Sequence, residues 1–111
     1  MTSPWPFGLY RVAGESMLPA LAPGDLLLGW RWSRPRPRPG RVVVARGPAG
    51  RPLVKRVARL AAVPTPAAVD APADGFWLLG DNAAASTDSR HFGVISGRDI
   101  EAAIIFRLKR T

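Results

Sequence analysis

The sequence contains no cysteine and a single histidine, His91. Without cysteine the chain has no disulfide bonds, no thiolate metal ligands and no cysteine nucleophile. One histidine does not form a histidine-rich metal site, and we interpret His91 as an exposed loop residue. The composition therefore predicts no resident metal or cofactor, and it leaves lysine, aspartate or glutamate as the base of any catalytic site.

Long apolar segments are also missing. No uncharged run reaches the length that crosses a bilayer, because proline, glycine or charged residues interrupt every run. Residues 1–10 lack the basic start and the apolar centre of a signal peptide. From these absences we expect a soluble, cytoplasmic protein.

The whole chain has a net charge of +8, and its middle part contains no acidic residue. The basic residues of this stretch are Arg31, Arg34, Arg36, Arg38, Arg41, Arg46, Arg51, Lys55, Arg56 and Arg59. We call residues 31–59 the basic stripe. Such a stripe attracts nucleic acid, an anionic membrane surface or an acidic protein, although solvated, arginine-rich strand edges are an equally simple interpretation.

The length and composition predict one domain over residues 1–111, with residues 1–8 as a flexible end. The chain has 47% hydrophobic residues, eleven glycines and twelve prolines, which favours one modest core and many turns. Strands are expected at 9–13, 25–32, 41–46, 51–63, 76–79 and 100–108, with a proline-rich connector at 33–40, a hairpin turn at 47–50 and loops at 64–74 and 83–93. This pattern predicts an all-β fold, a small, partly closed barrel of short antiparallel strands.

The segment G-E-S-M-L-P-A-L at residues 14–21 is the most unusual in the chain. Gly14 permits backbone dihedrals that are closed to other residues, and Pro19 stiffens the turn after Ser16. The turn therefore presents a hydroxyl and its neighbouring N–H on a rigid bend, as a nucleophile with its own oxyanion donor requires. A serine in a Gly/Pro turn is more often a simple turn residue, so this interpretation needs support from other segments. We expect Met17 and Pro19 to shape a substrate groove.

Lys55 provides part of that support. In the expected strand, Leu53, Lys55 and Val57 project to the same face. A lysine between two apolar neighbours either extends its ammonium to water or stays desolvated with a lowered pKa.

Three segments together resemble the type I signal peptidase family of serine/lysine proteases. They are G-E-S-M-L-P at 14–19, V-K-R-V at 54–57, and G-D-N at 80–82 followed by S-T-D-S-R-H-F-G at 86–93. The resemblance extends over about residues 9 to 106, and the third segment is long and specific. It implies a minimal signal-peptidase-like catalytic core and a serine endopeptidase.

The resemblance also implies roles for individual residues. Ser16 would be the nucleophile and Lys55 the general base, with Ser86 orienting the Lys55 ammonium. Asp88 and Arg90 would form an ion pair that fixes the loop around the base. The nucleophile turn consists of Gly14, Ser16 and Met17. Some relatives carry a second oxyanion donor where this chain has Gly14, and Asp81-Asn82 are interpreted as a structural turn.

The chain also departs from the family pattern. It begins about fifteen residues before Ser16 without a membrane anchor, the larger second domain is reduced to the 64–74 loop, and no Gly-x-Pro-Gly-Asp follows Lys-Arg-Val. In these respects it is most similar to the nickel-type superoxide dismutase maturation proteases. Those are thought to remove an N-terminal leader so that a new N-terminal histidine can bind nickel. The resemblance then implies a precursor protein as partner, and nickel belongs to that substrate.

Three alternatives stay open. A small signal peptidase would attach weakly to a membrane surface through Trp5, Phe7 and the basic stripe. A self-cleaving repressor-type peptidase would need an upstream bond within reach of Ser16, for which the preceding residues leave little room. A non-catalytic barrel would bind nucleic acid, but its aromatic residues are not interleaved with the basic ones, and it would have no use for Ser16, Lys55 and Ser86 together.

Overall fold

The computed structural model describes residues 5–31, 36–65 and 73–110. The strands in these ranges are β1 (Phe7–Arg11), β2 (Leu26–Trp30), β3 (Val42–Arg46), β4 (Pro52–Val57), β5 (Gly75–Phe76), β6 (Leu78–Leu79), β7 (Ile95–Ser96) and β8 (Ile100–Lys109). The helical segments are the 3-10 turns η1 (Leu60–Ala62), η2 (Ala83–Ala85) and η3 (Gly97–Asp99) and the short helix α2 (Ser89–Phe92).

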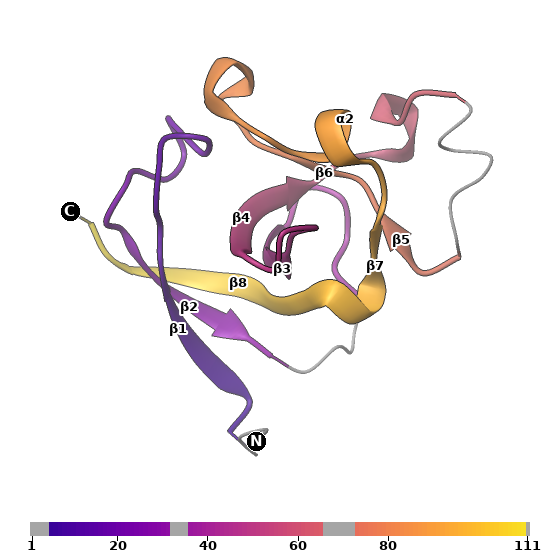
Figure 1. Cartoon of the computed structure of the whole chain (residues 1–111). Helices are drawn as coiled ribbons and strands as arrows, with labels where there is room; N and C mark the ends of the chain where they lie inside the picture. Colours follow the sequence, from indigo (N-terminus) through magenta and orange to yellow (C-terminus); the bar gives the residue numbers. More distant parts are fainter. Residues whose placement is uncertain (1–4, 32–35, 66–72, 111) are drawn as a thin grey trace.

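Six strands form one antiparallel sheet in the order β1-β2-β8-β3-β4-β6, and β5 pairs with β7 (Figure 1). The long strand β8 joins the two halves of the sheet, because it pairs with both β2 and β3. Register shifts in both pairings let β8 curve. Among the described strands, β1 and β6 lie at the two edges of this sheet and do not pair with each other, so the sheet does not close into a barrel. The prediction of an all-β, partly closed fold is confirmed.

Two apolar clusters form the core on opposite faces of the sheet, because Val43 belongs to the first and its neighbour Val42 packs against the second. One consists of Val43, Ala45, Val57, Phe76, Leu78 and Ile95. The other consists of Val12, Met17, Leu21 and Leu27. The second cluster contains residues from both ends of the β1–β2 connection, so it fixes the turn that carries Ser16 against the sheet.

The structure corrects two of the expected strands. The strand expected at 51–63 ends at Val57, because Ala58 instead donates its N–H to the Trp77 carbonyl and a 3-10 turn follows at Leu60–Ala62. The strand expected at 76–79 is divided between two sheets, since Phe76 pairs with Ile95 and Leu78 pairs with Val57.

The connections differ in how well the sequence predicts them. The expected hairpin turn at 47–50 joins β3 and β4, and the Gly50 N–H donates to the Gly47 carbonyl at 2.9 Å. The segment 83–93, expected as a loop, contains η2 and α2. The flexible end expected at 1–8 includes β1 from Phe7 onward, and residues 1–4 lie outside the described ranges. Residues 33–35 of the expected connector and 66–72 of the expected 64–74 loop also lie outside them.

Several arginines of the basic stripe are engaged in contacts within the fold. The Arg36 guanidinium lies 3.9 Å from the Phe76 ring centroid and donates to the Gly75 carbonyl. Arg41 donates to the Ile104 carbonyl at 3.0 Å, and Arg56 pairs with Asp81 at 2.8 Å. In the described residues, the stripe is therefore not a uniform surface of free cations.

Candidate active site

Ser16 lies in a compact turn that begins soon after β1. Gly14 has a φ of +77°, in the left-handed region that favours glycine, and the Leu18 N–H donates to the Glu15 carbonyl at 3.2 Å. The Leu18–Pro19 peptide bond is cis. The Ser16 side chain is half-buried, and within the described residues its N–H has no hydrogen-bonded acceptor. The turn can therefore offer one free N–H beside the hydroxyl.

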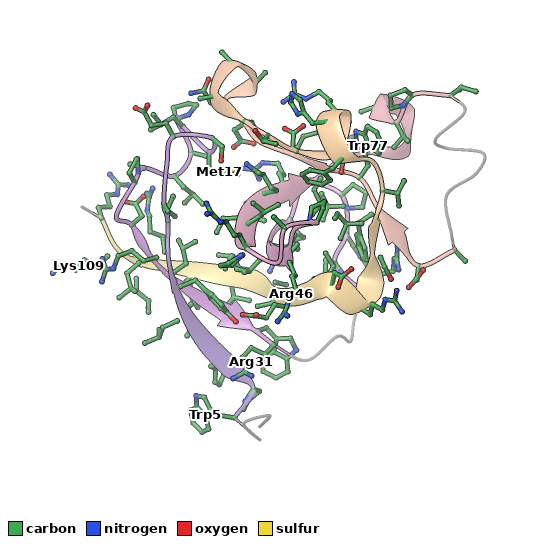
Figure 2. The ribbon with its side chains drawn as sticks, in the orientation of Figure 1. Trp5, Met17, Arg31, Arg46, Trp77 and Lys109 are labelled. Carbon is green, nitrogen blue, oxygen red and sulfur yellow. The ribbon has the colours of Figure 1, made fainter. Side chains whose placement is uncertain are left out.

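Met17 corrects an expectation about this turn. Its side chain is 0% exposed and packs with Val12, Leu21 and Leu27 (Figure 2). The Leu21 N–H also donates to the Met17 carbonyl. Met17 therefore anchors the turn in the core and does not shape a substrate groove.

Lys55 lies near the end of β4, and its side chain is only 4% exposed. It shares with Val57 the face of the strand that packs on the first apolar cluster, and it pairs with Val43 of β3. Its ammonium donates to Ser86 Oγ at 3.1 Å. Burial lowers the pKa of Lys55 from its ordinary value, and the nearby Asp88 carboxylate opposes that shift. Of the two outcomes that the sequence allows for this lysine, the structure has the desolvated one.

Ser86 connects Lys55 to a fully buried carboxylate. Its hydroxyl donates to Asp88 Oδ2 at 2.7 Å, and the Gly80 N–H donates to the same oxygen at 2.9 Å. Arg90 donates to both carboxylate oxygens, through Nε at 2.9 Å and Nη2 at 2.7 Å. Burial alone would raise the pKa of Asp88, but the hydrogen bonds from Arg90, Gly80 and Ser86 outweigh it and hold the pKa well below its usual range.

His91 completes the support of this loop. Asp88 is the N-cap of α2, and the Asp88 N–H donates to His91 Nδ1 at 3.2 Å in a capping box. His91 is exposed, as expected, but it belongs to α2 and not to an irregular loop.

The G-D-N segment holds the Ser16 turn against the Lys55 network. The Asn82 N–H donates to the Ser16 carbonyl at 2.8 Å, and Asn82 Nδ2 donates to the Glu15 carbonyl at 3.1 Å. A Cβ at Gly80 would lie 2.5 Å from Ser86 Cβ and 2.8 Å from the Ser16 carbonyl oxygen. Only glycine fits there, and the Ser16 backbone and Ser86 are therefore close neighbours.

The predicted site residues are thus gathered in one region, with one contact missing. Lys55, Ser86, Asp88 and Arg90 form a continuous chain of hydrogen bonds. Among the described residues, the Ser16 hydroxyl forms no hydrogen bond with Lys55. In free enzymes, catalytic hydrogen bonds are often long and tighten only when substrate binds.

The sequence did not assign the positioning contacts of Gly80, Asn82 and Arg56. Arg56 follows Lys55 and clamps Asp81 with two hydrogen bonds, at 2.9 and 2.8 Å. This clamp joins β4 to the G-D-N segment, so Asp81 and Asn82 have the structural role that the sequence suggested. The available signal was that Gly80 and Asn82 lie in the G-D-N segment and Arg56 in the V-K-R-V segment.

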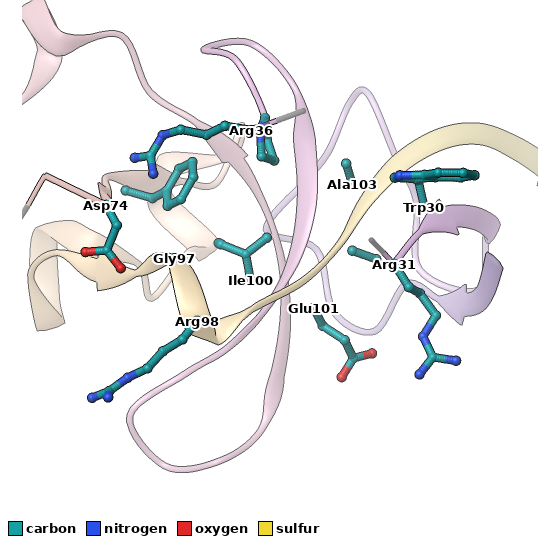
Figure 3. A pocket seen from close by; sticks show the side chains of 12 residues that line it. Trp30, Arg31, Arg36, Asp74, Gly97, Arg98, Ile100, Glu101 and Ala103 are labelled. Atoms are coloured by element: carbon teal, nitrogen blue, oxygen red, sulfur yellow. The ribbon is translucent and has the colours of Figure 1, made fainter. Parts of the chain in front are cut away.

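One hollow of the described residues lies away from Ser16 and Lys55. Its volume is about 260 Å³, and Trp30, Arg36 and Ile100 belong to its lining (Figure 3). Neither Ser16 nor Lys55 lines it. The Ser16 region is therefore proposed as the site on the chemistry of its residues and not on the shape of a cavity.

A family model matches the C-terminal part of the chain. Residues 61–109 match the family model described as signal peptidase, peptidase S26. This match includes Ser86, Asp88 and Arg90 but not Ser16 or Lys55, and it spans somewhat less than half of the chain. No curated protein matches the sequence. The helices in the described ranges are all too short to cross a bilayer. The match supports the signal peptidase I family and, with it, a signal-peptidase-like serine peptidase that acts on a protein substrate.

Proposed function

We propose that this chain is a Ser/Lys serine endopeptidase that removes an N-terminal leader from a precursor protein. The observation that carries the proposal is the buried Lys55, held by Ser86 and Asp88 beside the Ser16 turn. A serine hydroxyl is a weak nucleophile unless an adjacent base removes its proton. A lysine becomes such a base when burial lowers its pKa, and Ser/Lys pairs are an established variant of the serine protease site.

The hydrogen-bond directions explain how Lys55 would serve as that base. The Ser86 hydroxyl hydrogen is committed to Asp88, so Ser86 Oγ accepts an N–H from Lys55. When Lys55 is neutral, this bond uses one N–H and leaves the nitrogen lone pair free to accept the Ser16 proton. Ser86 is therefore a positioning residue for the base.

Acylation would then proceed through Ser16. Its Oγ bonds to the carbonyl carbon of the scissile peptide while its proton passes to Lys55 Nζ. The free N–H of Ser16 stabilises the oxyanion of the tetrahedral intermediate. When the C–N bond breaks, Lys55 returns the proton to the leaving amine, and the leader stays attached to Ser16 as an ester.

Deacylation repeats these steps with water as the nucleophile. Neutral Lys55 takes a proton from the water as its oxygen bonds to the ester carbonyl carbon. The Ser16–acyl bond then breaks, Ser16 Oγ recovers a proton from Lys55, and the leader leaves as a carboxylic acid. Neither half of the reaction needs a group beyond Ser16, Lys55 and water.

The substrate that we propose is the leader-bearing precursor of nickel superoxide dismutase. The support is the similarity to proteases that mature this enzyme, which rests on the short 64–74 segment and on the absence of Gly-x-Pro-Gly-Asp after Lys-Arg-Val. In this proposal, nickel is bound by the product of the reaction and not by the protease.

The test is cleavage of that precursor by the full-length protein, followed by intact-mass spectrometry. The expected result is one cut that exposes an N-terminal histidine, lost when Ser16 or Lys55 is replaced. Ser16-dependent cutting only of signal-peptide sequences with small residues before the scissile bond would favour a membrane-associated signal peptidase instead. Cutting of neither substrate would contradict the endopeptidase and favour a binding module.

Ser86→Ala should lower kcat on the order of 10²-fold, because Lys55 loses the one acceptor that orients it. Asp88 keeps its bonds from Gly80 and Arg90, so the fold should persist. Steady-state kinetics on the precursor measure the effect, and Thr87→Ala at the exposed neighbouring position is the control. A Ser86→Ala enzyme as fast as the control would contradict the positioning role.

Gly80→Ala should lower both stability and activity. The added methyl would press Ser86 and the Ser16 carbonyl apart, at a cost of about 1–3 kcal/mol in the free energy of unfolding. Such displacement should lower kcat/KM at least about tenfold. Gly50→Ala is the control, because its Cβ has open space and only its φ of +81° is unfavourable, so it should lose stability alone. Urea denaturation and precursor cleavage separate the two effects, and equal activity in both variants would contradict the contact.

A further inference from the structure

The outer face of β1, β2 and β8 carries three rows of side chains that strand pairing aligns. The rows are Phe7/Trp30/Ala103, Leu9/Leu28/Phe106 and Arg11/Leu26/Lys109. Paired residues in antiparallel strands project to the same side, and alternate residues of a strand share a face. The three rows therefore lie next to one another, and Ala103 at the end of the first row packs against the first apolar cluster. We call the three rows the outer face, because beyond Ala103 they lie outside both clusters.

In the middle row, Leu9 and Phe106 are exposed although they are apolar, and Leu28 between them is half-buried. Leu9 is 64% exposed and Phe106 is 65% exposed. Trp5, 63% exposed, extends the apolar surface, with its ring centroid 5.7 Å from that of Phe7. Contiguous exposed apolar residues with a polar rim mark interaction surfaces.

A hollow lies within this surface. Its volume is about 370 Å³, and its lining is Trp5, Phe7, Gly8, Leu9 and Leu28. This volume is at the small end of the range for binding pockets, so the hollow can receive one bulky apolar group.

The rim of the outer face is positively charged. Arg11 and Lys109 flank Leu26, and Lys109 forms no ion pair with the described residues (Figure 2). Glu101 is the acid within these three strands, and it acts on Tyr10, whose ring lies over Gly8 on the opposite face. Burial and Glu101 together raise the pKa of Tyr10 to about 12. Arg11 donates to the Gly24 carbonyl, and neither Arg11 nor Lys109 forms an ion pair with a carboxylate of the described residues.

We propose that the outer face is a docking surface for an acidic, apolar segment of the protein substrate, separate from the bond that is cut. Apolar side chains of the segment would cover Leu9, Leu28 and Phe106, and its carboxylates would meet Arg11 and Lys109. The identity of the partner as the precursor rests on the proposed function. The preference of the outer face for an acidic, apolar polypeptide is independent of the proposed function.

Other occupants fit this face less well. A second copy of the chain would bring two rows of like charge together, between molecules that each carry +8. An anionic lipid surface has matching chemistry, but the hollow beside Leu9 suits a single inserted side chain. A polypeptide also gains from the location, because β1 ends at Arg11, five residues before Ser16. A docked segment would raise the effective concentration of the attached leader at the nucleophile.

The first test uses the full-length Ser16→Ala protein, which should not cut its ligands, in a backbone NMR titration. The probes are an eight-residue peptide of alternating Leu and Glu, the same peptide with Lys for Glu, and phosphatidylglycerol vesicles. We expect the Leu/Glu peptide to shift the amide signals of Leu9, Leu28 and Phe106, and the Leu/Lys peptide to leave them unchanged.

Variants assign the binding to the two parts of the surface. Leu9→Ser/Phe106→Ser should weaken the affinity for the Leu/Glu peptide at least about tenfold. Arg11→Gln/Lys109→Gln should remove most of its salt dependence. Arg46→Gln/Arg51→Gln removes the same charge from the exposed β3–β4 hairpin and should change neither quantity. Absent shifts with the Leu/Glu peptide, equal shifts with both peptides, or shifts produced only by the vesicles would each overturn the proposal.

The second test connects the surface to the substrate. On the full precursor, Leu9→Ser/Phe106→Ser should lower kcat/KM at least about tenfold through KM, with no change on a short peptide spanning the cut bond. Equal losses on both substrates would overturn the docking of the precursor. Failure of the wild-type protein to cut the precursor would instead overturn the proposed function, and the NMR result would still decide the preference of the surface.

Discussion

Replacing Ser16 with alanine is expected to lower the rate of precursor cleavage at least about 10³-fold while leaving the fold intact. The proposed reaction has no substitute for the Ser16 oxygen, because the chain has no cysteine and the other hydroxyl of the site, on Ser86, donates to Asp88. The Ser16 side chain forms no hydrogen bond in the described residues, so the free energy of unfolding should change by less than about 0.5 kcal/mol.

The measurement is intact-mass spectrometry of the precursor over time, with urea denaturation of the same protein samples. Ser96→Ala is the matched control, since it removes the same atom from a half-buried serine whose hydroxyl donates to Asp74 at 3.2 Å. The control should cleave as fast as the wild-type protein. Cleavage by Ser16→Ala at a rate near that of the control would show that Ser16 is not the nucleophile.

Replacing Lys55 with methionine should lower cleavage by a similar factor, at least about 10³-fold, for a different reason. Methionine keeps most of the apolar stem that packs in β4 but cannot accept the Ser16 proton. The free energy of unfolding should stay within about 1.5 kcal/mol of the wild-type value, because two effects oppose each other. The variant loses the hydrogen bond to Ser86, but it no longer has to bury an amine. Arg51→Met, on the exposed hairpin, is the control for the loss of a cation.

The pH profile distinguishes a base from a merely structural lysine. The neutral amine is the active form, so kcat should rise with pH, with a midpoint below the ordinary lysine pKa of 10.5. At pH values between the pKa of Lys55 in the folded protein and its higher pKa in the unfolded chain, Lys55 binds a proton in the unfolded chain but not in the folded protein. The free energy of unfolding should therefore rise with pH across that window, and this rise should be absent in Lys55→Met. An activity optimum on the acid side would contradict Lys55 as the base.

The sequence was sufficient for properties that depend on local periodicity. Alternation placed Lys55 and Val57 on one face of a strand, and the G-x-A-G turn at 47–50 predicted the β3–β4 hairpin. Glycine and proline at 14 and 19 predicted a rigid bend around Ser16, where Gly14 does have a φ of +77°. These features follow from the dihedral preferences of single residues and from the two-residue period of a strand, so a linear pattern contains them.

The sequence was insufficient where distant segments compete for the same residue. Met17 was expected at a groove, but the cluster with Val12, Leu21 and Leu27 buries it completely. The expected strand at 76–79 separates because Phe76 and Leu78 pair with different partners. The capping box of α2 uses a histidine where glutamate or glutamine is usual, so its pattern did not indicate a helix.

By itself, the sequence determined the all-β class, the three motif segments and the residue types available for chemistry, because composition and spacing are properties of the linear chain. The tertiary structure decided which of these residues meet. It desolvates Lys55, commits the Ser86 hydrogen to Asp88 and uses Gly80 as the only residue that fits between Ser86 and the Ser16 backbone. It also leaves the outer face of β1, β2 and β8 exposed. Burial, hydrogen-bond direction and exposure arise from packing between residues far apart in the chain, and no local pattern specifies them.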